Sequence, residues 1–494
     1  MGGVVAAGHP VTAEAGADVL RAGGNAVDAA IGAMLASFAA EPLLTGLGAG
    51  GFMLVVPPDR EPVLLDFFVE APGREGDPAA RAPLVPVDVS FGDVVQVFHI
   101  GASAAGTYGT PSGICTASQR FGTVPLEALA APAAALARAG VEITPEQAYV
   151  YEILAPIEAA TPESRALFMP EGRLLQAGDR FCNPDLGDAL ERLAADGDAP
   201  FYTGDVAEKV TTWVAARGGM LGPADLAAYT TCDREPIRVD YHGRDVLLNP
   251  PPSAGGILIA YALAVLARTP GAPSTEELVE VMGLAQAERT PAFLAGLADP
   301  GFQQSFLARR LGSTTHISVL DEDGWGCSVT CTNGEGCGEV VPGTGIHLNN
   351  MMGEQDLSPL GWFRHPPGRR LPSMMAPTIV LADGRPELVV GSAGSNRIRS
   401  AILQVIVNVL DRGMDAVAAV EAPRIHFEDG VVYAEPGVDL GPLIAQRQAV
   451  ERFRTRNLFF GGAQAVLREP GTGLLSGAAD PRRGGSAVIV REQA

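Results

Sequence analysis

The chain has 494 residues and a mass of 51.1 kDa, with 47% hydrophobic and 19% charged residues. This composition excludes wholesale disorder, and the length suits about three ordinary domains or one large layered unit. The formal charge of −22 repels phosphate backbones and anionic lipid, so we expect neither a nucleic-acid partner nor a membrane surface. The 60 glycines and 39 prolines imply many tight turns, as in a layered α/β protein.

Cysteine usage and the chain start point to a reduced, soluble protein. Six cysteines in a chain of this length do not make a disulfide framework. The first ten residues lack the basic region of a signal peptide. The longest apolar stretch, residues 253–267, is too short and too rich in glycine to span a bilayer. We therefore expect a cytoplasmic location.

Hydrophobic spacing predicts that helices dominate the first two-thirds of the chain. The predicted helices are residues 12–21, 26–40, 124–139, 145–160, 186–195, 206–216, 257–267 and 274–289. A strand pair is predicted at 51–57 and 62–68, and one longer strand at 239–249. Residues 70–82 are predicted to be a loop, and residues 299–313 form a poorly patterned connector.

Beyond the connector, the pattern changes to short strands. Alternating runs at 316–320 and 327–332 flank Asp-Glu-Asp-Gly at 321–324, which predicts a hairpin. A second pair is predicted at 378–381 and 387–390, followed by a helix at 396–410. The last third of the chain therefore begins with strands, and we find no internal repeat.

A glycine-rich run, Gly-Leu-Gly-Ala-Gly-Gly at residues 46–51, contains the spacing Gly-x-Gly-x-x-Gly. A dinucleotide-binding loop of this kind follows a strand and opens a helix. Here a predicted helix precedes the run and a predicted strand follows it. We interpret the run as a tight turn whose backbone closely approaches another segment.

Three cysteines cluster near the predicted hairpin, at Cys327, Cys331 and Cys337, with His316 and His347 nearby. Their spacing is not that of a zinc site. Cys327 and Cys331 would share one face of a strand, which favours small core residues over metal ligands. A Gly-x-Ser-x-Gly elbow is absent from the sequence, which disfavours an α/β-hydrolase.

Three consecutive hydroxyl residues, Ser313, Thr314 and Thr315, open the strand at 316. On spacing alone, a strand start with a serine/threonine turn carries more weight. The alternative is a self-cleaving N-terminal nucleophile, in which a hydroxyl attacks its own preceding carbonyl and water hydrolyses the ester. The freed residue then has an α-amine, with a pKa of about 7.7–8.0, that can act as the general base for its own hydroxyl.

A series of short motifs spans the whole chain, at residues 8–10, 23–30, 41–42, 46–53, 65–67, 250–256, 314–319, 342–350, 373–379, 391–397 and 422–424. In this order they resemble the γ-glutamyltranspeptidase family, which makes self-cleavage the favoured interpretation at Thr314. The resemblance implies a four-layer αββα sandwich of the N-terminal-nucleophile hydrolase type.

The resemblance also implies how the chain would be divided. The precursor would cut itself between Ser313 and Thr314. Residues 1–313 would become a large subunit and residues 314–494 a small one, and the two would stay together as a heterodimer in one αββα unit. No metal or organic cofactor is implied, because the freed amine supplies the base.

Catalytic roles carry over to matching positions. Thr314 matches the family nucleophile, and Thr332 matches the threonine that hydrogen-bonds it. Gly394 and Ser395 fall on the Gly-Gly pair whose N–H groups form the oxyanion hole. Ser395 keeps a backbone N–H, so the hole can survive this substitution.

The substrate pocket departs from the family pattern. The arginine that clamps the glutamyl α-carboxylate is replaced by Phe68, for which core packing and pocket lining are weighed equally. Without that arginine a free α-carboxylate loses a contact worth about 2–3 kcal/mol. Ser373 and Met374 stand where the family has paired serines. Glu354 aligns with the acid that holds the α-amine, and Asn333, after a one-residue gap, with the asparagine near the nucleophile.

Three functional hypotheses follow. The first is an N-terminal threonine hydrolase or acyltransferase that cleaves a γ-glutamyl or related small-molecule amide, such as glutathione. The second keeps the nucleophile but shifts the substrate, as in relatives that are cephalosporin-type acylases, other amidohydrolases, or enzymes that hydrolyse a carbon–carbon bond in specialised-metabolite biosynthesis. The third is an unprocessed, non-catalytic binding relative, against which the intact Thr314 and Thr332 argue.

Overall fold

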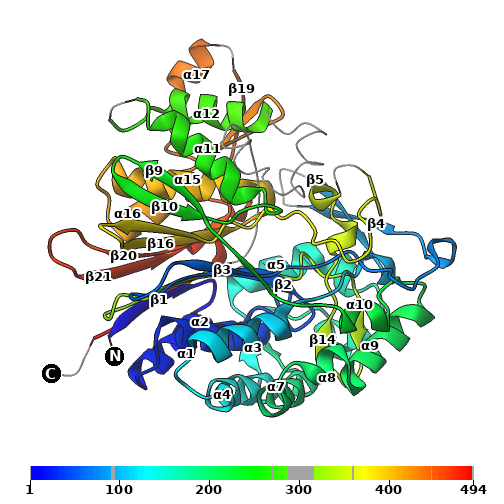
Figure 1. Cartoon of the computed structure of the whole chain (residues 1–494). Helices are drawn as coiled ribbons and strands as arrows, with labels where there is room; N and C mark the ends of the chain where they lie inside the picture. The colour runs from blue at the N-terminus through cyan, green and yellow to red at the C-terminus, as the bar shows by residue number, and fades with distance from the viewer. Residues whose placement is uncertain are drawn as a thin grey trace.

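Two β-sheets stacked face to face form the centre of the molecule, and helices cover the outer face of each sheet (Figure 1). The computed structural model describes residues 2–90, 95–269, 271–287, 316–358, 361–446 and 448–491. The four-layer αββα sandwich that the resemblance implies is confirmed. The predicted cleavage pair Ser313 and Thr314, and the connector at 299–313, lie outside the described residues.

The first sheet draws its strands from both ends of the chain. Within the described residues its order is β22-β1-β11-β12-β2-β3-β8, with every neighbouring pair antiparallel. The strands are Gly3–Ala7 (β1), Gly50–Val56 (β2), Val63–Phe67 (β3), Cys232–Arg234 (β8), His316–Asp321 (β11), Gly326–Thr332 (β12) and Ser486–Val490 (β22). Strand β1 therefore lies between two strands from the last third of the sequence.

The second sheet has the order β21-β20-β16-β15-β10-β9 among the described residues. Its strands are Ile237–Tyr241 (β9), Arg244–Leu248 (β10), Thr378–Ala382 (β15), Arg385–Ala393 (β16), Gly462–Arg468 (β20) and Leu475–Ala479 (β21). Short ladders outside the sandwich are Val85–Ser90 (β4) with Val95–Ile100 (β5), Val141–Glu142 (β6) with Arg180–Phe181 (β7), Val340–Val341 (β13) with Ile346–His347 (β14), and Ile425–Glu428 (β17), Val431–Ala434 (β18) and Ala449–Arg452 (β19).

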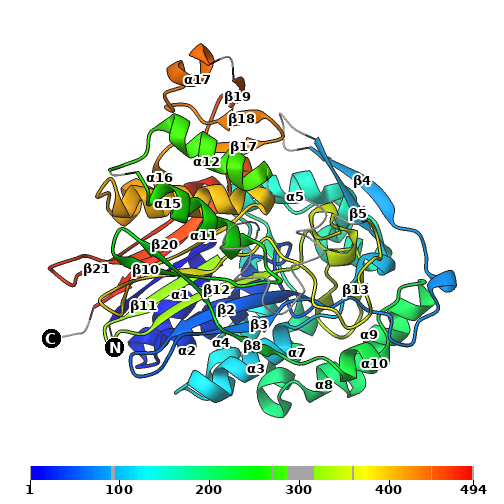
Figure 2. The ribbon, with the colours of Figure 1, turned by 45° about the horizontal axis from the view of Figure 1, so that its top comes forward.

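Helices form the two outer layers and one end of the molecule. The layer on the first sheet contains Pro10–Arg21 (α1), Ala26–Ala40 (α2), Thr110–Phe121 (α3), Leu126–Ala139 (α4) and Pro184–Asp196 (α7). The layer on the second contains Gly255–Leu266 (α11), Thr275–Ala287 (α12), Ile398–Leu410 (α15) and Ala416–Glu421 (α16), and Gly441–Ala445 (α17) lies beyond α12, away from the sheet (Figure 1). The others are Pro145–Glu158 (α5), Pro162–Phe168 (α6), Ala199–Tyr202 (α8), Asp205–Ala216 (α9) and Pro223–Ala227 (α10). Helix α5 and the β4–β5 ladder lie at the end opposite the chain termini (Figure 1, Figure 2).

Side-chain alternation along the strands produces the layers. In β1, Val4 and Ala6 pack into the core between the sheets, and Val5 and Ala7 pack under the helices. Strand β2 repeats this pattern. Helix α2 is buried along its whole length, and Asn25 caps its first turn by accepting hydrogen bonds from the backbone N–H groups of Val27 and Asp28.

Most predicted elements are present, and one strand prediction is wrong. Residues 239–249 are not a single strand but part of the hairpin β9–β10. His242 (φ 51°) and Gly243 (φ 78°) form its turn, and two consecutive positive φ values are typical of a type I′ hairpin turn. Strand β1 and helix α3 are further elements that the sequence analysis did not predict.

The glycine-rich run at 46–51 lies against neighbouring backbone, as expected. A methyl group on Gly48 would lie 2.3 Å from the carbonyl oxygen of His347, and one on Gly51 would lie 2.3 Å from that of Thr330. The cysteines near the predicted hairpin are also placed in the core, on the helix side of the first sheet. Cys331 Sγ lies 3.4 Å from Thr110 Oγ1.

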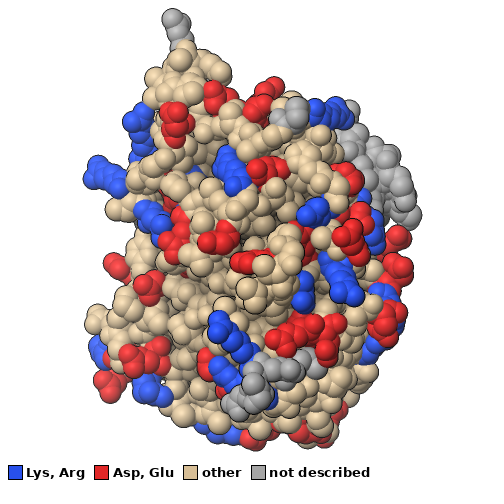
Figure 3. All heavy atoms as spheres, turned by 90° about the vertical axis from the view of Figure 1, so that its left-hand side faces the viewer, with Lys and Arg blue, Asp and Glu red and all other residues tan. Residues whose placement is uncertain are grey.

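Acidic and basic side chains are interspersed over the face shown in Figure 3. The formal charge of −22 is therefore not gathered into a one-signed patch on that face. Across the described part of the chain, no helix combines the length and the apolar character needed to cross a membrane.

Candidate functional site

Of the residues singled out from the sequence, those that the structure describes lie toward one end of the sandwich, the end at which the described part of β11 begins. In the first sheet β1 ends at Ala7, β11 begins at His316 and β12 ends at Thr332. His316, the first described residue of β11, pairs with Thr330 of β12. Thr332 therefore lies two residues further along β12, past the point where the described part of β11 begins. The second sheet packs against the start of β11, because a methyl group on Gly391 of β16 would lie 2.3 Å from His316 Nδ1.

Thr332 and Asn333 leave β12 in a tight turn. Thr332 Oγ1 accepts a hydrogen bond from the backbone N–H of Gly334 (2.7 Å). The Asn333 backbone N–H donates to the carbonyl of Leu44 (2.9 Å). The Asn333 side chain is fully buried, yet neither its Oδ1 nor its Nδ2 has a hydrogen-bond partner in the described part of the chain. Such an amide is costly to leave unsatisfied, so its two polar atoms are available to a partner that the described residues do not supply.

Glu354 lies directly against this turn. A methyl group at Gly334 would lie 2.2 Å from Glu354 Oε1 and 2.0 Å from Asn350 Oδ1, and Gly334 has φ 67°. Asn350 Oδ1 accepts the backbone N–H of Glu335 (3.1 Å). Two carboxyl side chains, Glu335 and Glu354, thus flank the turn that follows Thr332.

Gly394 and Ser395 form a strained turn at the end of β16. Gly394 has φ 120° and Ser395 has φ 50°, and a positive φ is uncommon at a non-glycine residue. A methyl group on Gly394 would lie 2.7 Å from Gly461 Cα. The turn is closed by a hydrogen bond from the Arg397 N–H to the Gly394 carbonyl (3.1 Å).

Ser373 and Met374 precede β15, whose first residue lies opposite Val390 of β16, so they lie at the same end of the second sheet. The Ser373 hydroxyl accepts the Met375 N–H (3.0 Å), and its carbonyl accepts the Ala254 N–H (3.0 Å). Both side chains are buried. Ser373 is thus held by the turn before α11.

Phe68 belongs to the core between the sheets. Its side chain is 1% exposed and stacks on Phe52 with ring centroids 5.4 Å apart. Its carbonyl accepts hydrogen bonds from Tyr229 (2.7 Å) and Arg370. The ring therefore packs in the core between the sheets, and its part in a substrate pocket stays a prediction.

His316 is held as a neutral strand residue. Burial lowers its pKa to about 3. Its Nδ1 lies 3.0 Å from Thr330 Oγ1 and its Nε2 2.8 Å from Ser318 Oγ. The ring links β11 to β12, and its low pKa leaves it uncharged at neutral pH.

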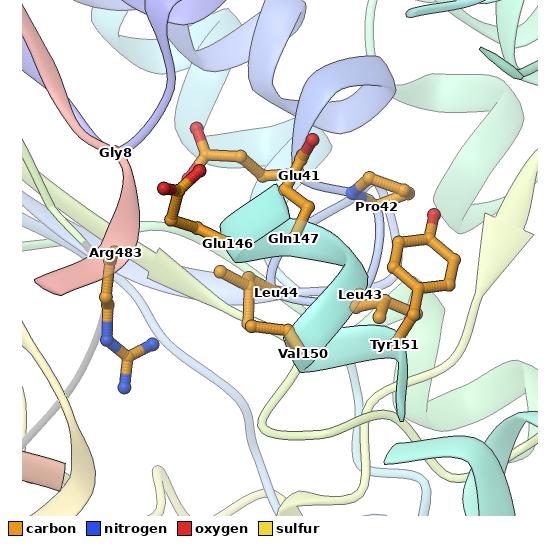
Figure 4. Close-up of a pocket in the computed structure, with 10 residues that line it drawn as sticks. All are labelled: Gly8, Glu41, Pro42, Leu43, Leu44, Glu146, Gln147, Val150, Tyr151 and Arg483. Atoms are coloured by element: carbon orange, nitrogen blue, oxygen red, sulfur yellow. The ribbon is translucent and has the colours of Figure 1, made fainter. Parts of the chain in front are cut away.

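Arg483 lies on the segment that joins β21 of the second sheet to β22 of the first. Its Nη2 is 3.7 Å from the position that a methyl group would take on Gly394. Its Nε is buried without a hydrogen-bond partner among the described residues. Arg483 also lines a pocket with Glu41 and Glu146, and its guanidinium points away from both of these side chains (Figure 4).

Two carboxyl groups near Arg483 have raised pKa values. Burial raises the pKa of Glu41 to about 7, with Arg483 opposing the rise. Burial also raises the pKa of Glu335 to about 7, opposed by Arg397 and Arg483. Burial and the neighbouring Arg397 lower the pKa of Arg483 to about 10, so it remains charged at neutral pH.

The site offers polar and charged groups rather than a metal cage. In the described ranges there is no group of three His, Cys, Asp or Glu side chains placed to hold a metal ion.

The sequence analysis assigned no role to Glu335 or Arg483. The signal for Glu335 was its place two residues beyond Asn333. The signal for Arg483 was that it is the second arginine of the run Asp480-Pro481-Arg482-Arg483. This run has neither helical nor strand periodicity, so no predicted element accounts for the second arginine.

Comparison with known proteins adds to this geometry. The sequence profile of the family described as Gamma-glutamyltranspeptidase matches residues 12–311 and 302–490. The "Acylase ACY 1 proenzyme" of Pseudomonas sp. (strain SE83) is 33% identical, over 99% of this chain and 93% of that protein. The "Glutathione hydrolase proenzyme" of Escherichia coli (strain K12) is 31% identical, over 97% and 90%. Among solved structures, cephalosporin acylase from Bacillus halodurans superposes with a TM-score of 0.85 at 26% identity, over 100% of this chain and 96% of that chain.

Proposed function

The chain belongs to the gamma-glutamyltranspeptidase family of enzymes, and on this premise we propose that it is a self-processing N-terminal threonine hydrolase and acyltransferase. The precursor cuts itself between Ser313 and Thr314. Residues 1–313 and 314–494 then remain together as a heterodimer. Similarity to proteins named proenzymes supports this processing.

In the proposed mechanism the α-amine of Thr314 takes the proton of its own hydroxyl, which attacks the amide carbonyl of the substrate. The backbone N–H groups of Gly394 and Ser395 stabilise the oxyanion that forms. The protonated amine then gives its proton to the leaving amine, and an ester on Thr314 remains. Water or a second amine attacks this ester and releases the acyl group. Thr332 holds the nucleophile by a hydrogen bond.

One observation carries the proposal. Thr332, the unsatisfied amide of Asn333, Glu354 and the strained Gly394–Ser395 turn lie at the end of the sandwich where β11 begins. The strand β11 directly follows Thr314 and Thr315 in the sequence. A nucleophile at the start of this strand would have an oxyanion hole and polar binding groups supplied by both sheets.

The acyl group is the open part of the proposal. Our first candidate is a γ-glutamyl or related amide, with Asn333, Glu354 and Ser373 as binding groups. A shifted acyl specificity is the second candidate, favoured by the core position of Phe68 and by the apolar Met374 where the family has a serine. The Pseudomonas relative named an acylase is consistent with it.

The test begins with intact masses of the purified wild type and of Thr314→Ala. Two wild-type fragments, the smaller beginning at Thr314, beside one full-length mutant chain are expected. Both proteins are then incubated with γ-glutamyl-p-nitroanilide. Release of p-nitroaniline by the wild type alone supports the first candidate, and fragments without release favour the second. A single uncut wild-type chain would refute self-processing and point to a non-catalytic relative.

A further inference from the structure

A chain of hydrogen bonds begins at Asn396, the residue that follows the strained turn at the end of β16. Asn396 Nδ2 donates a hydrogen bond to Glu428 Oε1 (2.7 Å). The other carboxylate oxygen, Glu428 Oε2, lies 3.3 Å from His426 Nε2. His426 Nδ1 in turn lies 2.8 Å from Ser400 Oγ, and His426 and Ser400 are both buried. The chain therefore ties the turn to strand β17 and to helix α15.

The protonation states fix the direction of these hydrogen bonds. Burial opposes the ionisation of Glu428, but a hydrogen bond from His426 and two arginine charges lower its pKa to about 2. Burial lowers the pKa of His426 to about 4, so its ring is neutral at pH 7 and carries one N–H. That N–H is on Nε2, because Nε2 faces an ionised carboxylate, which can only accept. The amide of Asn396 must likewise turn its NH2 group toward Glu428, which fixes the orientation of the amide.

The backbone on either side of the Asn396 side chain is held as well. Arg399 Nε donates to the carbonyl of Asn396 (3.1 Å). The Arg397 N–H closes the turn on the carbonyl of Gly394 (3.1 Å). Ser395 has φ 50°, a conformation that a non-glycine residue keeps only where surrounding contacts impose it. The side-chain hydrogen bond of Asn396 is such a contact, because it fixes the residue that directly follows Ser395.

We propose that Asn396 and Glu428 are positioning residues for the oxyanion hole. Their hydrogen bond keeps Ser395 at its positive φ, and so aims the backbone N–H groups of Gly394 and Ser395 at the point where negative charge develops. Two neighbouring arginines offset the negative charge of Glu428, and the pair acts through the backbone without touching the substrate. This inference rests on the proposed function for the location of the oxyanion hole.

Turnover by variants of the pair tests this role. Asn396→Ala should lower kcat about 10- to 100-fold and change KM less than about 2-fold, because the donors of an oxyanion hole act in the transition state. The probe is γ-glutamyl-p-nitroanilide or glutaryl-p-nitroanilide, whichever the cleaved wild type turns over faster. Glu451→Ala, which removes an exposed acid of β19 in the same small sheet as Glu428, is the matched control and should leave both constants unchanged.

An exchange of the two chemical groups tests the hydrogen bond itself. Asn396→Asp places two carboxylates against each other and should lower kcat at least as far as Asn396→Ala does. The double variant Asn396→Asp/Glu428→Gln restores one donor and one acceptor in reversed order, at unchanged net charge. It should raise kcat at least about 10-fold above that of Asn396→Asp alone. Intact mass and urea unfolding of each variant separate lost positioning from lost cleavage or lost folding.

Hydrogen exchange measures the anchoring of the turn without any substrate. The amide of Arg397, whose hydrogen bond closes the turn, should exchange at least about 10-fold faster in Asn396→Ala than in the wild type. Glu451→Ala should exchange at the wild-type rate. Mass spectrometry of the peptic fragment that contains Arg397 records these rates.

The outcomes separate the two proposals. An unchanged kcat in Asn396→Ala, a loss through KM alone, or unchanged exchange at Arg397 would each overturn the inference. Faster exchange beside an uncut wild-type chain that releases no p-nitroaniline would refute the proposed function, and the catalytic part of the inference with it, while the anchoring of the turn would stand. If the cleaved wild type turns over neither anilide, the exchange at Arg397 decides. If Asn396→Ala does not fold, failure of Glu428→Gln to restore kcat to Asn396→Asp would still overturn the inference.

Discussion

Replacement of Asp480 by asparagine should destabilise the protein by about 3–5 kcal/mol, the usual cost of removing one partner from a buried ion pair. Asp480 is fully buried. Its carboxylate accepts the backbone N–H groups of Ala463 (2.8 Å) and Arg482 (2.9 Å). It also pairs with Arg424 (2.7 Å) and with the side chain of Arg482 (3.1 Å). With Glu435 the cluster has two carboxylates for two guanidinium groups, so an amide at position 480 leaves one positive charge uncompensated.

The measurement is urea unfolding at pH 7, in the Thr314→Ala background so that a single chain unfolds. Asp188→Asn is the matched control, because Asp188 pairs with Arg138 at 2.7 Å on the surface, with 74% of its side chain exposed, and should cost less than about 1 kcal/mol. Burial alone would raise the pKa of Asp480, but Arg424 and Arg482 hold it below its usual 3.8. The stability it contributes is therefore present at neutral pH and lost as the pH falls through the folded-state pKa, so the difference between wild type and Asp480→Asn should narrow in strong acid. A loss no larger than that of Asp188→Asn at pH 7 would refute the reasoning.

Three further predictions concern the site. Between pH 5 and pH 8 the free energy of unfolding of Glu41→Gln should rise by up to about 3 kcal/mol relative to that of the wild type. Burial raises the pKa of Glu41 from 4.5 to about 7 in the folded protein, so ionisation of this carboxyl as the pH rises destabilises the folded wild type. If urea unfolding gives the same difference between variant and wild type at both pH values, the prediction is contradicted. Thr332→Val should lower kcat at least about 10-fold with little change in KM, measured on cleaved enzyme, and an unchanged kcat would remove Thr332 from the proposed machinery. Phe68→Ala should lower the free energy of unfolding by about 3–5 kcal/mol. Phe68→Arg should impair folding rather than tighten the binding of γ-glutamyl-p-nitroanilide. A soluble Phe68→Arg variant with a lower KM for this substrate would show that the ring is not a core residue.

Elements with a strong local signal could be predicted from the sequence. Helix α2 has Asn25 as a cap and an apolar run behind it, and the β11–β12 hairpin has alternating residues around an Asp-Gly turn. Strand β1 could not be predicted locally, because five small and β-branched residues become a strand only when β11 and β22, more than 300 residues away, supply its hydrogen bonds. The turn at His242-Gly243 was missed because this dipeptide is not one of the Asn-Gly, Asp-Gly or Gly-Gly pairs that usually signal a two-residue hairpin turn.

The residues of the candidate site likewise fall into those that the sequence could indicate and those that it could not. Thr332, Asn333, Glu354, Gly394 and Ser395 could be proposed because each belongs to a recognisable motif, and the structure places them at one end of the sandwich. Phe68 could not be assigned from sequence, since the residue type fits both a core and a pocket lining. The position of Arg483 beside Gly394 depends on the crossover between two sheets, which leaves no periodic signal in the sequence.

The order of strands in the first sheet has a consequence for biogenesis. If the chain is cut before Thr314, β1 belongs to one subunit and both of its neighbours, β11 and β22, belong to the other. Neither subunit could form this sheet alone, and each would expose unpaired strand edges prone to aggregation. Cleavage must therefore come after folding. Halves synthesised separately should be insoluble, and separation of the mature subunits should require the same denaturant concentration as unfolding itself.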